Sequence, residues 1–135
     1  MMNKCLKCPI CPFVVEGRFM KSTATDAVVK LNSAVTCQTK NIIYCITCTK
    51  CNEQYIGQSE RTLQDRFSEH RDYVKHEKIG KATGWHFNKK GHSVHDMVVT
   101  ILEKVHTSDK HEREERENMY IRNFNTKYKG INRIC

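Results

Sequence analysis

The chain has 135 residues, enough for one catalytic-sized domain with a small appendage. Its 23 lysines and arginines outnumber its 15 aspartates and glutamates, which gives a formal net charge of +8 and favours a polyanionic partner, nucleic acid first. No apolar run is long enough to span a bilayer, and the polar, cysteine-rich segment 1–12 lacks the apolar core of a signal peptide. We therefore expect an intracellular, nuclear protein without a membrane association.

The cysteines are numerous and clustered. There are eight of them, at positions 5, 8, 11, 37, 45, 48, 51 and 135. In a reducing compartment disulfides do not persist, and clustered cysteines usually bind metal. A secreted disulfide scaffold is the alternative, because the number of cysteines is even.

Residues 1–40 predict a small β-rich module. Short apolar pieces at 13–15, 27–31 and 35–37 are separated by polar residues and Gly17, as in a small sheet with turns. These pieces are too short to bury a core, so a bound structural metal ion is needed to stabilise the module. Four thiolates are available for a tetrahedral zinc site, with the exact ligand set left open: Cys5, Cys8, Cys11 and Cys37.

Residues 41–57 predict a β-hairpin. The first strand is the β-branched run 42–46 and the second is 53–56. A two-residue turn at 49–50 would place Tyr44 opposite Tyr55 and Cys48 opposite Cys51, with both tyrosines on one face. A zinc knuckle at the tip could shift this register by one residue.

The remaining elements follow in chain order. A helix is expected after Thr62, a candidate N-cap with Asp65 three residues on, and it places Arg66 and His70 on one face at i, i+4. A polar loop over 75–84, a strand over 97–103 and a final helix capped by Ser108 complete the chain.

A second metal site is predicted between the hairpin tip and a later pair of histidines. Cys48 and Cys51 are at knuckle spacing, and His86 and His92 could complete a Cys2His2 set. His95 and Cys45 are alternative ligands, although Cys45 should point to the opposite face of the strand and belong to the core.

Several short motifs occur in a recognisable order. Ile43-Tyr44 is followed by Tyr55-Ile56-Gly57, then by the helical pair Arg66 and His70, by Glu117-x-x-x-Ile121, and by Gly130-Ile131-Asn132. In this order and with these gaps the motifs, over roughly residues 41–134, resemble the GIY-YIG nucleases.

The resemblance extends to one branch of these nucleases. The cysteine-rich segment upstream, the cysteine pair between the tyrosine motifs and the histidine pair downstream are most similar to the C-terminal endonuclease of Penelope-like retroelements. Two positions depart from the homing-endonuclease pattern: Ile42 stands where the first glycine is expected, and one residue is added between Tyr55 and Arg66.

The resemblance implies a fold and an activity. The expected fold is α+β, with a short antiparallel sheet flanked by helices over 41–135, preceded by the zinc-binding module 1–40. The expected activity is metal-dependent hydrolysis, by nicking, of a phosphodiester bond in double-stranded DNA. A reverse transcriptase region is the implied further partner, in cis or in trans. A catalytically inactive, zinc-binding nucleic-acid module is the alternative function.

The resemblance also implies roles for individual residues. Tyr44 would be the general base, which requires a lowered phenol pKa, because an unperturbed phenol is a poor base at neutral pH. Arg66 would grip phosphate, and Glu117 would hold one Mg²⁺. Tyr55 and His70 would lie near the nucleophile. Asn132 would support the site without taking part in the chemistry, and Gly57 would allow another group to approach the backbone closely where the strand ends.

Glu117 could have a role other than metal ligand, and Glu114 is a second candidate for the metal ligand. Glu117 shares the apolar side of its helix with Ile121 and Phe124, so its carboxylate needs a partner, for which a metal is suitable. Glu114 falls on much the same face, and only the family motif selects Glu117. The alternative is a half-buried glutamate paired with Arg66 or Arg113.

Overall fold

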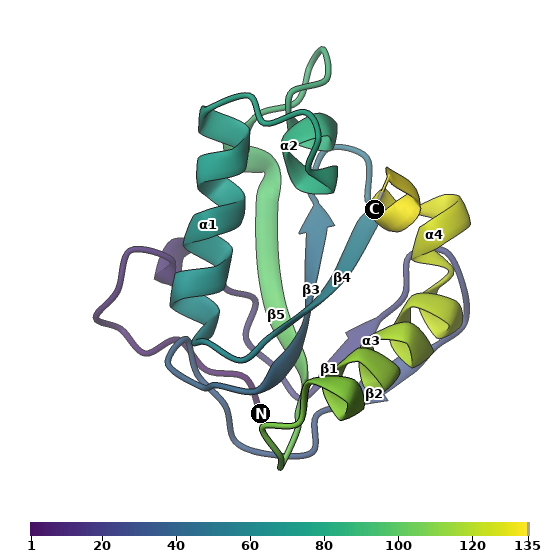
Figure 1. Cartoon of the computed structure of the whole chain (residues 1–135). Helices are drawn as coiled ribbons and strands as arrows, with labels where there is room; N and C mark the ends of the chain where they lie inside the picture. The colour runs from purple at the N-terminus through teal and green to yellow at the C-terminus, as the bar shows by residue number, and fades with distance from the viewer. Residues whose placement is uncertain (135) are drawn as a thin grey trace.

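A three-stranded antiparallel sheet forms the centre of the computed structural model, which describes residues 1–134 (Figure 1). Strand β3 (Ile42–Cys48) lies between β4 (Gln54–Ser59) and β5 (Met97–Lys104), so β4 is an edge strand. The helices are α1 (Leu63–Lys75), α2 (Ala82–Phe87), α3 (Lys110–Phe124) and α4 (Thr126–Lys129), and the 3-10 turns are η1 (Cys11–Phe13), η2 (Val94–Asp96) and η3 (Ile131–Ile134). The expected α+β class is confirmed.

Strand β3 is buried on both faces because helices cover both sides of the sheet. Tyr44 and Ile46 belong to a core that includes Phe67 of α1. Ile43 and Cys45, which point the other way, pack in a second core with residues of α3. Cys45 is therefore a core residue, as predicted, and the continuous apolar sequence of the strand follows from this double burial.

The register of the β3–β4 hairpin differs from the predicted one by two residues. Tyr44 pairs with Gly57 and Ile46 pairs with Tyr55, and the backbone N–H of Cys48 donates to the Glu53 carbonyl at 2.9 Å. A two-residue hairpin turn usually needs positive φ at both central positions, which a β-branched residue such as the threonine at 49 resists. The longer loop instead uses Asn52, with φ 65°, in the left-handed region. An even shift leaves both tyrosines on the same face.

The helix boundaries follow local capping. The hydroxyl of Thr62 accepts from the Asp65 N–H at 3.1 Å, which confirms the predicted cap of α1. The predicted cap of α3 at Ser108 is wrong: Asp109 is the N-cap, and its carboxylate accepts from the His111 N–H at 2.9 Å. Asp is at least as good a cap as Ser, and it carries a charge that the N-terminus of a helix favours.

Helix α2 begins in the last residues of the predicted loop 75–84 and continues beyond it to Phe87. Its start at Ala82 is possible because Gly84 packs directly on another part of the backbone, where a Cβ would lie 2.9 Å from the carbonyl carbon of Lys78. A polar, glycine-containing sequence gives little helical periodicity, which explains the incorrect prediction.

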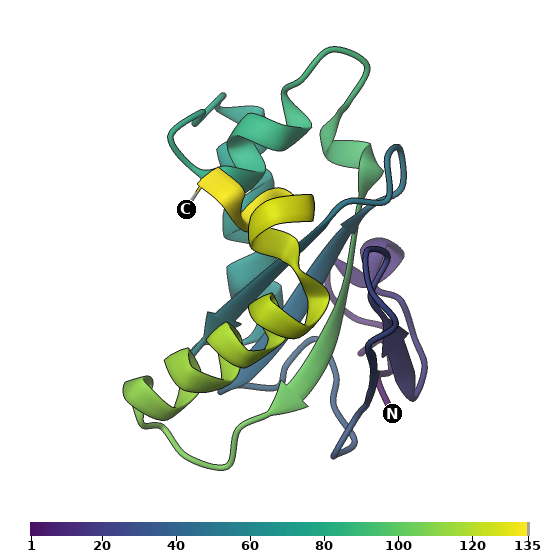
Figure 2. The same cartoon turned by 90° about the vertical axis from the view of Figure 1, so that its right-hand side faces the viewer.

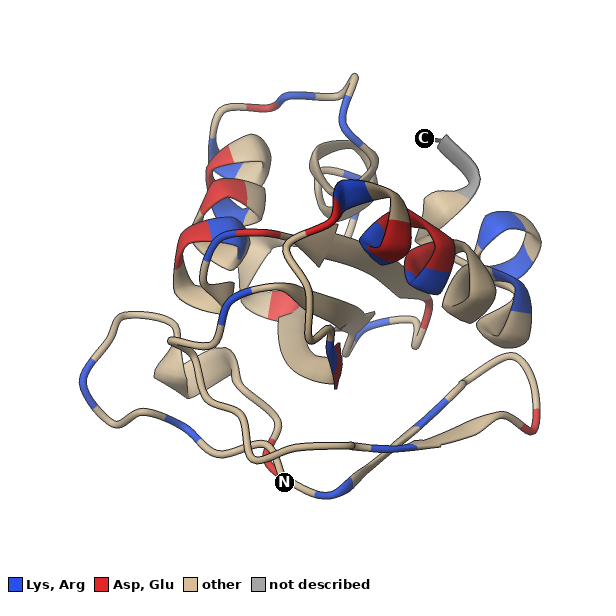
Figure 3. Ribbon diagram, turned by 60° about the horizontal axis from the view of Figure 1, so that its bottom comes forward, with Lys and Arg blue, Asp and Glu red and all other residues tan. Residues whose placement is uncertain are grey.

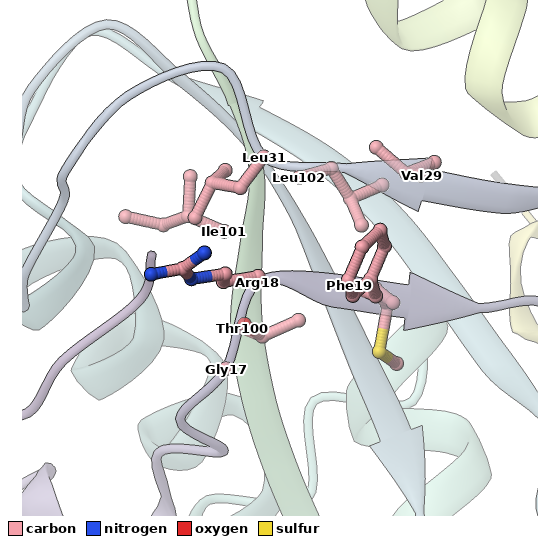
Figure 4. A pocket seen from close by; sticks show the side chains of 9 residues that line it. Gly17, Arg18, Phe19, Val29, Leu31, Thr100, Ile101 and Leu102 are labelled. Carbon is pink, nitrogen blue, oxygen red and sulfur yellow. The ribbon is translucent and has the colours of Figure 1, made fainter.

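The first 40 residues pack beside β5, the edge strand opposite β4 (Figure 2). They contain one hairpin, β1 (Phe19–Lys21) with β2 (Val28–Lys30). Strand β2 lies within the expected piece 27–31, whereas β1 was not predicted. The pieces at 13–15 and 35–37 are not strands, because Val14 and Val35 each form only an isolated bridge. Figure 4 shows Leu31 and Ile101 facing each other between hairpin and sheet, where a cavity of only about 10 Å³ remains.

No helix within residues 1–134 is long and apolar enough to cross a membrane. Charged side chains are distributed unevenly over the surface (Figure 3). Helices α1 and α3 carry both signs, whereas α4 carries lysines without acidic residues, at Lys127 and Lys129.

Candidate active site and metal centres

Tyr44 lies at the centre of the candidate active site. Its side chain is fully buried under α1, and its ring lies across the paired residue Gly57 on the edge strand β4. A Cβ at position 57 would fall 2.9 Å from Tyr44 Cε2 and closer still to the hydroxyl. Only glycine therefore permits this close approach, as the sequence predicted for this position.

Arg66 and His70 both reach the Tyr44 hydroxyl from one face of α1. Arg66 Nε donates to Tyr44 Oη at 3.0 Å, and His70 Nε2 lies 2.7 Å from the same oxygen. Their i, i+4 spacing places the two groups one helical turn apart, so a single strand residue can contact both. The structure thus brings together three of the predicted site residues.

His70 is neutral and its second ring nitrogen also has a partner. Burial and, to a smaller extent, the nearby Arg66 charge lower the pKa of His70 to about 3, while Glu69 partly opposes them. His70 Nδ1 lies 2.7 Å from the hydroxyl of Thr83 on α2, and both side chains are buried. The three residues Tyr44, His70 and Thr83 form a chain of hydrogen bonds that runs from the sheet through α1 to α2.

The Tyr44 phenol has the opposite pKa shift from the one that a simple base would need. Burial raises the pKa of Tyr44 well above its ordinary value, and Tyr55 adds to this rise, while the Arg66 charge only partly opposes it. The phenol is therefore protonated at neutral pH. A role in deprotonating water requires that Tyr44 pass its own proton to a neighbour.

Tyr55 lies beside this group rather than opposite Tyr44. Its ring centroid is 6.4 Å from that of Tyr44 and 5.2 Å from that of His70. These edge and tilted contacts fit hydrophobic packing of the aromatic rings. Tyr55 also sits one diagonal step along the sheet from Tyr44, which keeps its hydroxyl on the same side.

Glu117 lies on α3, which packs against the edge strand β4. Burial raises the pKa of Glu117 to about 7, Glu114 adds to the rise, and Arg66 counteracts part of it. Glu117 also contributes to raising the pKa of Tyr44, so the carboxylate and the phenol are electrostatic neighbours. Arg113, the other proposed partner, instead donates to Gln58 at 2.9 Å and lies 3.9 Å from Glu60. A half-buried carboxylate of this kind is a suitable ligand for a cation.

Asn132 supports the edge strand without facing the tyrosines. Its side-chain oxygen accepts from the Ile56 N–H at 2.7 Å, and its amide nitrogen donates to the Ile56 carbonyl at 2.9 Å. Both groups are on the outer side of β4, which the sheet leaves unpaired. The amide therefore imitates a neighbouring strand next to Gly57, in keeping with its expected supporting role.

The first cysteine cluster has the geometry of a tetrahedral metal site. The sulfur of Cys11 lies 3.7 Å from Cys5, 3.6 Å from Cys8 and 3.8 Å from Cys37. Zinc–sulfur bonds of about 2.3 Å in a tetrahedron place the sulfurs about 3.8 Å apart. The four sulfurs lie within 4.8 Å of one another, so this cluster can hold a zinc ion. Cys135 lies outside the described residues.

The second cluster joins the hairpin tip to helix α2 and the loop after it. Its members are the four predicted ligands, Cys48, Cys51, His86 and His92, whose ligand atoms lie within 4.8 Å of one another. Cys51 Sγ is 3.5 Å from His86 Nε2, close to the roughly 3.5 Å expected between sulfur and nitrogen on one tetrahedral zinc ion. His95 is exposed, and neither His95 nor Cys45 belongs to a cluster among residues 1–134.

His92 is oriented so that one ring nitrogen is free to bind a cation. Its Nδ1 donates to the Lys90 carbonyl at 3.4 Å, so in the neutral imidazole Nε2 carries no proton. Nε2 is buried and has no hydrogen-bond partner among the described side chains and backbone. Burial also raises the pKa of Cys48 to about 11, so its thiolate needs a nearby positive charge. The donors fit zinc in type, number and distance.

A family model described as the GIY-YIG catalytic domain matches residues 40–132, the range that contains all the candidate catalytic residues. The chain belongs to the GIY-YIG family. Among solved structures, the catalytic domain of the homing endonuclease I-TevI is similar, with 28% sequence identity and a TM-score of 0.54 over 68% of this chain and 96% of that chain. No curated protein sequence matches the chain.

The GIY-YIG match confirms the resemblance of the sequence at the level of the family, so Ile42 in place of the first glycine does not remove the chain from it. The second cysteine–histidine cluster lies within the matched GIY-YIG range, whereas the first cluster lies before it.

The sequence did not single out three residues of this GIY-YIG site. Glu69 forms an ion pair with Arg66 and a second one with Arg61, the latter at 2.9 Å. Tyr73 lies edge-on to His70, with ring centroids 5.7 Å apart. Helical spacing could have predicted Glu69 and Tyr73, since they lie three and seven residues after Arg66 on the same face of α1. Thr83, in contrast, lies in α2 within the predicted loop 75–84, and no local sequence pattern links it to His70.

Proposed function

We propose that this GIY-YIG protein is a metal-dependent DNA endonuclease that hydrolyses a phosphodiester bond with Tyr44 at the reacting centre. The observation that carries the proposal is the Tyr44 hydroxyl itself, which receives a hydrogen bond from Arg66 and lies 2.7 Å from the neutral His70. The similarity to the catalytic domain of a homing endonuclease supports DNA as the substrate. The excess of basic residues supports it independently.

The protons move through Tyr44 to His70 in the proposed reaction. The attacking water gives a proton to the Tyr44 oxygen as the Tyr44 hydroxyl proton passes to His70 Nε2, so Tyr44 remains a phenol and His70 becomes an imidazolium. This relay avoids a free phenolate, which the raised pKa of Tyr44 disfavours. It requires that the negative charge of bound DNA phosphate, by offsetting the Arg66 charge, raise the pKa of His70 from its low value in the free protein. The water oxygen bonds to phosphorus, and the bond from phosphorus to the leaving 3′ oxygen breaks.

Arg66 holds the scissile phosphate in this proposal. Its Nε–H is committed to Tyr44 and one Nη1–H to Glu69, and its further N–H groups can bind a phosphate oxygen. Because the guanidinium is always charged, it neutralises the phosphate at any working pH. Its contact with Tyr44 then fixes the distance between the phosphate and the proton relay.

Glu117 would hold the catalytic metal, for which we propose one Mg²⁺. When bound, this ion supplies a Lewis acid that neutralises the developing charge on the leaving oxygen. The support is chemical: magnesium prefers oxygen ligands and binds through one or two carboxylates, and Glu117 is a half-buried carboxylate whose charge is poorly solvated. Zinc, proposed for the two sulfur-rich clusters, has a structural role there.

A finer assignment rests on the similarity of the cysteine and histidine pattern to Penelope-like retroelement endonucleases. We propose that the chain derives from such an element, works in the nucleus beside a reverse transcriptase, in cis or in trans, and nicks one strand. Nicking is supported by the presence of one Tyr44-centred cluster, since one such cluster can act on one phosphodiester at a time. The domain division, with a zinc module at 1–40 before the nuclease at 41–135, is part of the same proposal.

The test is a plasmid-nicking assay. Supercoiled plasmid incubated with the protein and Mg²⁺ should become relaxed circles, and Glu117→Ala should abolish this conversion. The matched control is Glu115→Ala, which removes an exposed glutamate from the same helix and should keep full activity. Tight DNA binding by the wild type without any cleavage would reject the proposal in favour of a catalytically inactive nucleic-acid module.

A further inference from the structure

Helix α2 touches both the candidate active site and the second metal cluster. Thr83 Oγ1 lies 2.7 Å from His70 Nδ1, and three residues later His86 Nε2 lies 3.5 Å from Cys51 Sγ. Residues three apart on a helix lie on neighbouring positions of one face. One helical turn therefore joins the end of the proposed proton relay to a candidate zinc ligand.

One arrangement of protons satisfies each donor and acceptor of the relay. Arg66 Nε can only donate, so the Tyr44 oxygen accepts from it. The hydroxyl proton of Tyr44 is then available for His70, and in this arrangement Nε2 accepts it. In a neutral imidazole with an unprotonated Nε2, the proton is on Nδ1 and points at the Thr83 hydroxyl.

The other tautomer of His70 would block the relay. With a proton on Nε2, the Tyr44 oxygen would face two donors, and His70 could not receive the Tyr44 proton. When Tyr44 donates to Nε2, the Thr83 hydroxyl is the acceptor for Nδ1–H, and because Thr83 is only 1% exposed, water has little access to replace it.

We propose that Thr83 is a positioning residue, which keeps His70 in its Nδ1–H tautomer so that Tyr44 can pass on a proton, and that the metal site at His86 holds Thr83 in place. This inference rests on the proposed nuclease mechanism. Thr83 does not touch the substrate and acts through His70 alone.

Helix α2 needs an external anchor to keep Thr83 in position. It has six residues and its N-cap, Lys81, provides no side-chain hydrogen bond. A helix this short is unstable alone, so its tertiary contacts determine where it sits. Phe87 anchors one side in the core, and His86, fully buried, anchors the other at the Cys48–Cys51 knuckle. Loss of the metal at this knuckle would release the anchor nearest to Thr83.

The first experiment changes only the hydroxyl. Thr83→Val keeps the shape of the side chain and removes the acceptor, and Thr83→Ser restores the acceptor. The control is Thr126→Val, at an equally buried threonine whose hydroxyl has no hydrogen-bond partner among the described residues. Nitrogen-15 NMR of the His70 ring should show the Nδ1–H tautomer in the wild type, the serine variant and the control, and a shift toward the Nε2–H tautomer in the valine variant.

Single-turnover cleavage of DNA gives the second readout. Thr83→Val should lower the rate about 10-fold to 100-fold, the range found when an outer-shell hydrogen bond is lost, with unchanged DNA affinity. Thr83→Ser should recover most of the rate. A His70 tautomer that does not change in Thr83→Val, or a valine rate within about twofold of the wild type, overturns the proposal.

The metal anchor is tested with Cys51→Ser, since Cys51 is exposed at the hairpin tip and its loss leaves the first cluster intact. Zinc content should fall by one ion per chain, and the His70 ring should change from one tautomer to a mixture. An unchanged His70 spectrum at the lower zinc content refutes the anchor. If the wild type binds DNA but never cleaves it, the proposed function fails, whereas the NMR result still decides whether Thr83 controls His70.

Discussion

The ring of Tyr44 lies directly across β3–β4 from Gly57, in a space that exists only because residue 57 has no side chain. This contact sets how deeply the Tyr44 hydroxyl lies between Arg66 and His70. One small residue therefore determines how Tyr44 meets Arg66 and His70.

Gly57→Ala should displace the Tyr44 ring, because the new methyl group would overlap the ring and the hydroxyl. Overpacking of this kind costs about 1–3 kcal/mol, which thermal unfolding would detect. The cleavage rate should fall far more than the loss of folded protein explains, since both hydrogen bonds to Tyr44 Oη would lengthen. Gly80→Ala is the control, because nothing lies within 4 Å of a Cβ at that position. Equal effects of the two substitutions would show that the close approach has no functional role.

Tyr44→Phe should leave the fold and DNA binding intact and lower the cleavage rate about 10²-fold to 10⁴-fold, the range for loss of a general base. The ring still fills its place in the core, and only the hydroxyl that links Arg66 to His70 is lost. Single-turnover rates and equilibrium DNA binding are the two measurements. A Tyr44→Phe protein with the wild-type rate would mean that the hydroxyl is not in the reaction, and His70 would become the candidate base.

The sequence predicted the elements that have their own periodicity or cap. Thr62 and Asp65 marked the start of α1 because capping is a local interaction, and β3 could be read from its β-branched run. The hairpin register could not be predicted, because the loop length depends on where Asn52 takes its left-handed conformation. The Ser108 cap was wrong by one residue, since two adjacent good caps differ only in local backbone geometry.

The site was predictable where helical spacing or a family motif determines it. Arg66 and His70 meet Tyr44 because i, i+4 spacing fixes them on one face. The partner of His70 was not predictable, because Thr83 reaches it only through the packing of α2 on α1. The pKa of Tyr44 was expected to fall and instead rises, since the degree of burial is a property of the tertiary structure.

His70 should make stability depend on pH. Its pKa is about 3 in the folded protein against 6.5 for an ordinary histidine, so between these values the unfolded chain binds a proton that the folded chain does not. The contribution of His70 to the unfolding free energy is therefore fully present above pH 6.5, and it is lost as the pH falls from 6.5 toward 3. Between pH 7.5 and pH 5.5 the wild type should lose about 1.4 kcal/mol relative to His70→Gln.

The measurement for His70 is the difference in unfolding free energy between wild type and His70→Gln at each pH, which cancels effects that both proteins share. Nitrogen-15 NMR provides a direct check, because the His70 ring should remain neutral at pH 5. A difference that stays constant from pH 7.5 to pH 5.5 would contradict the low pKa of His70.

Metal removal should destabilise the protein sharply. Both clusters join segments that are distant in sequence, and binding free energies of about 10–16 kcal/mol for structural zinc act directly on folding. Elemental analysis should find two zinc ions per chain, and Cys11→Ser should lower this number and the melting temperature. Cys45→Ala is the control: it perturbs a buried cysteine that belongs to neither cluster, so zinc content should stay at two. A melting curve unaffected by exhaustive chelation would refute both sites.

The last prediction separates the roles of Glu117 and Arg66. Glu117→Gln should abolish cleavage and leave DNA affinity unchanged or higher, because the change removes a negative charge near the phosphate and the proposed ligand of Mg²⁺. Arg66→Ala should lower cleavage and affinity together, since the guanidinium binds the phosphate in the ground state and the transition state alike. Cleavage rates and equilibrium binding, measured at the same salt concentration, distinguish the two patterns. Loss of DNA affinity in Glu117→Gln, or full affinity in Arg66→Ala, would reverse the assignment, because the carboxylate would then support binding and the arginine would serve only to hold Tyr44.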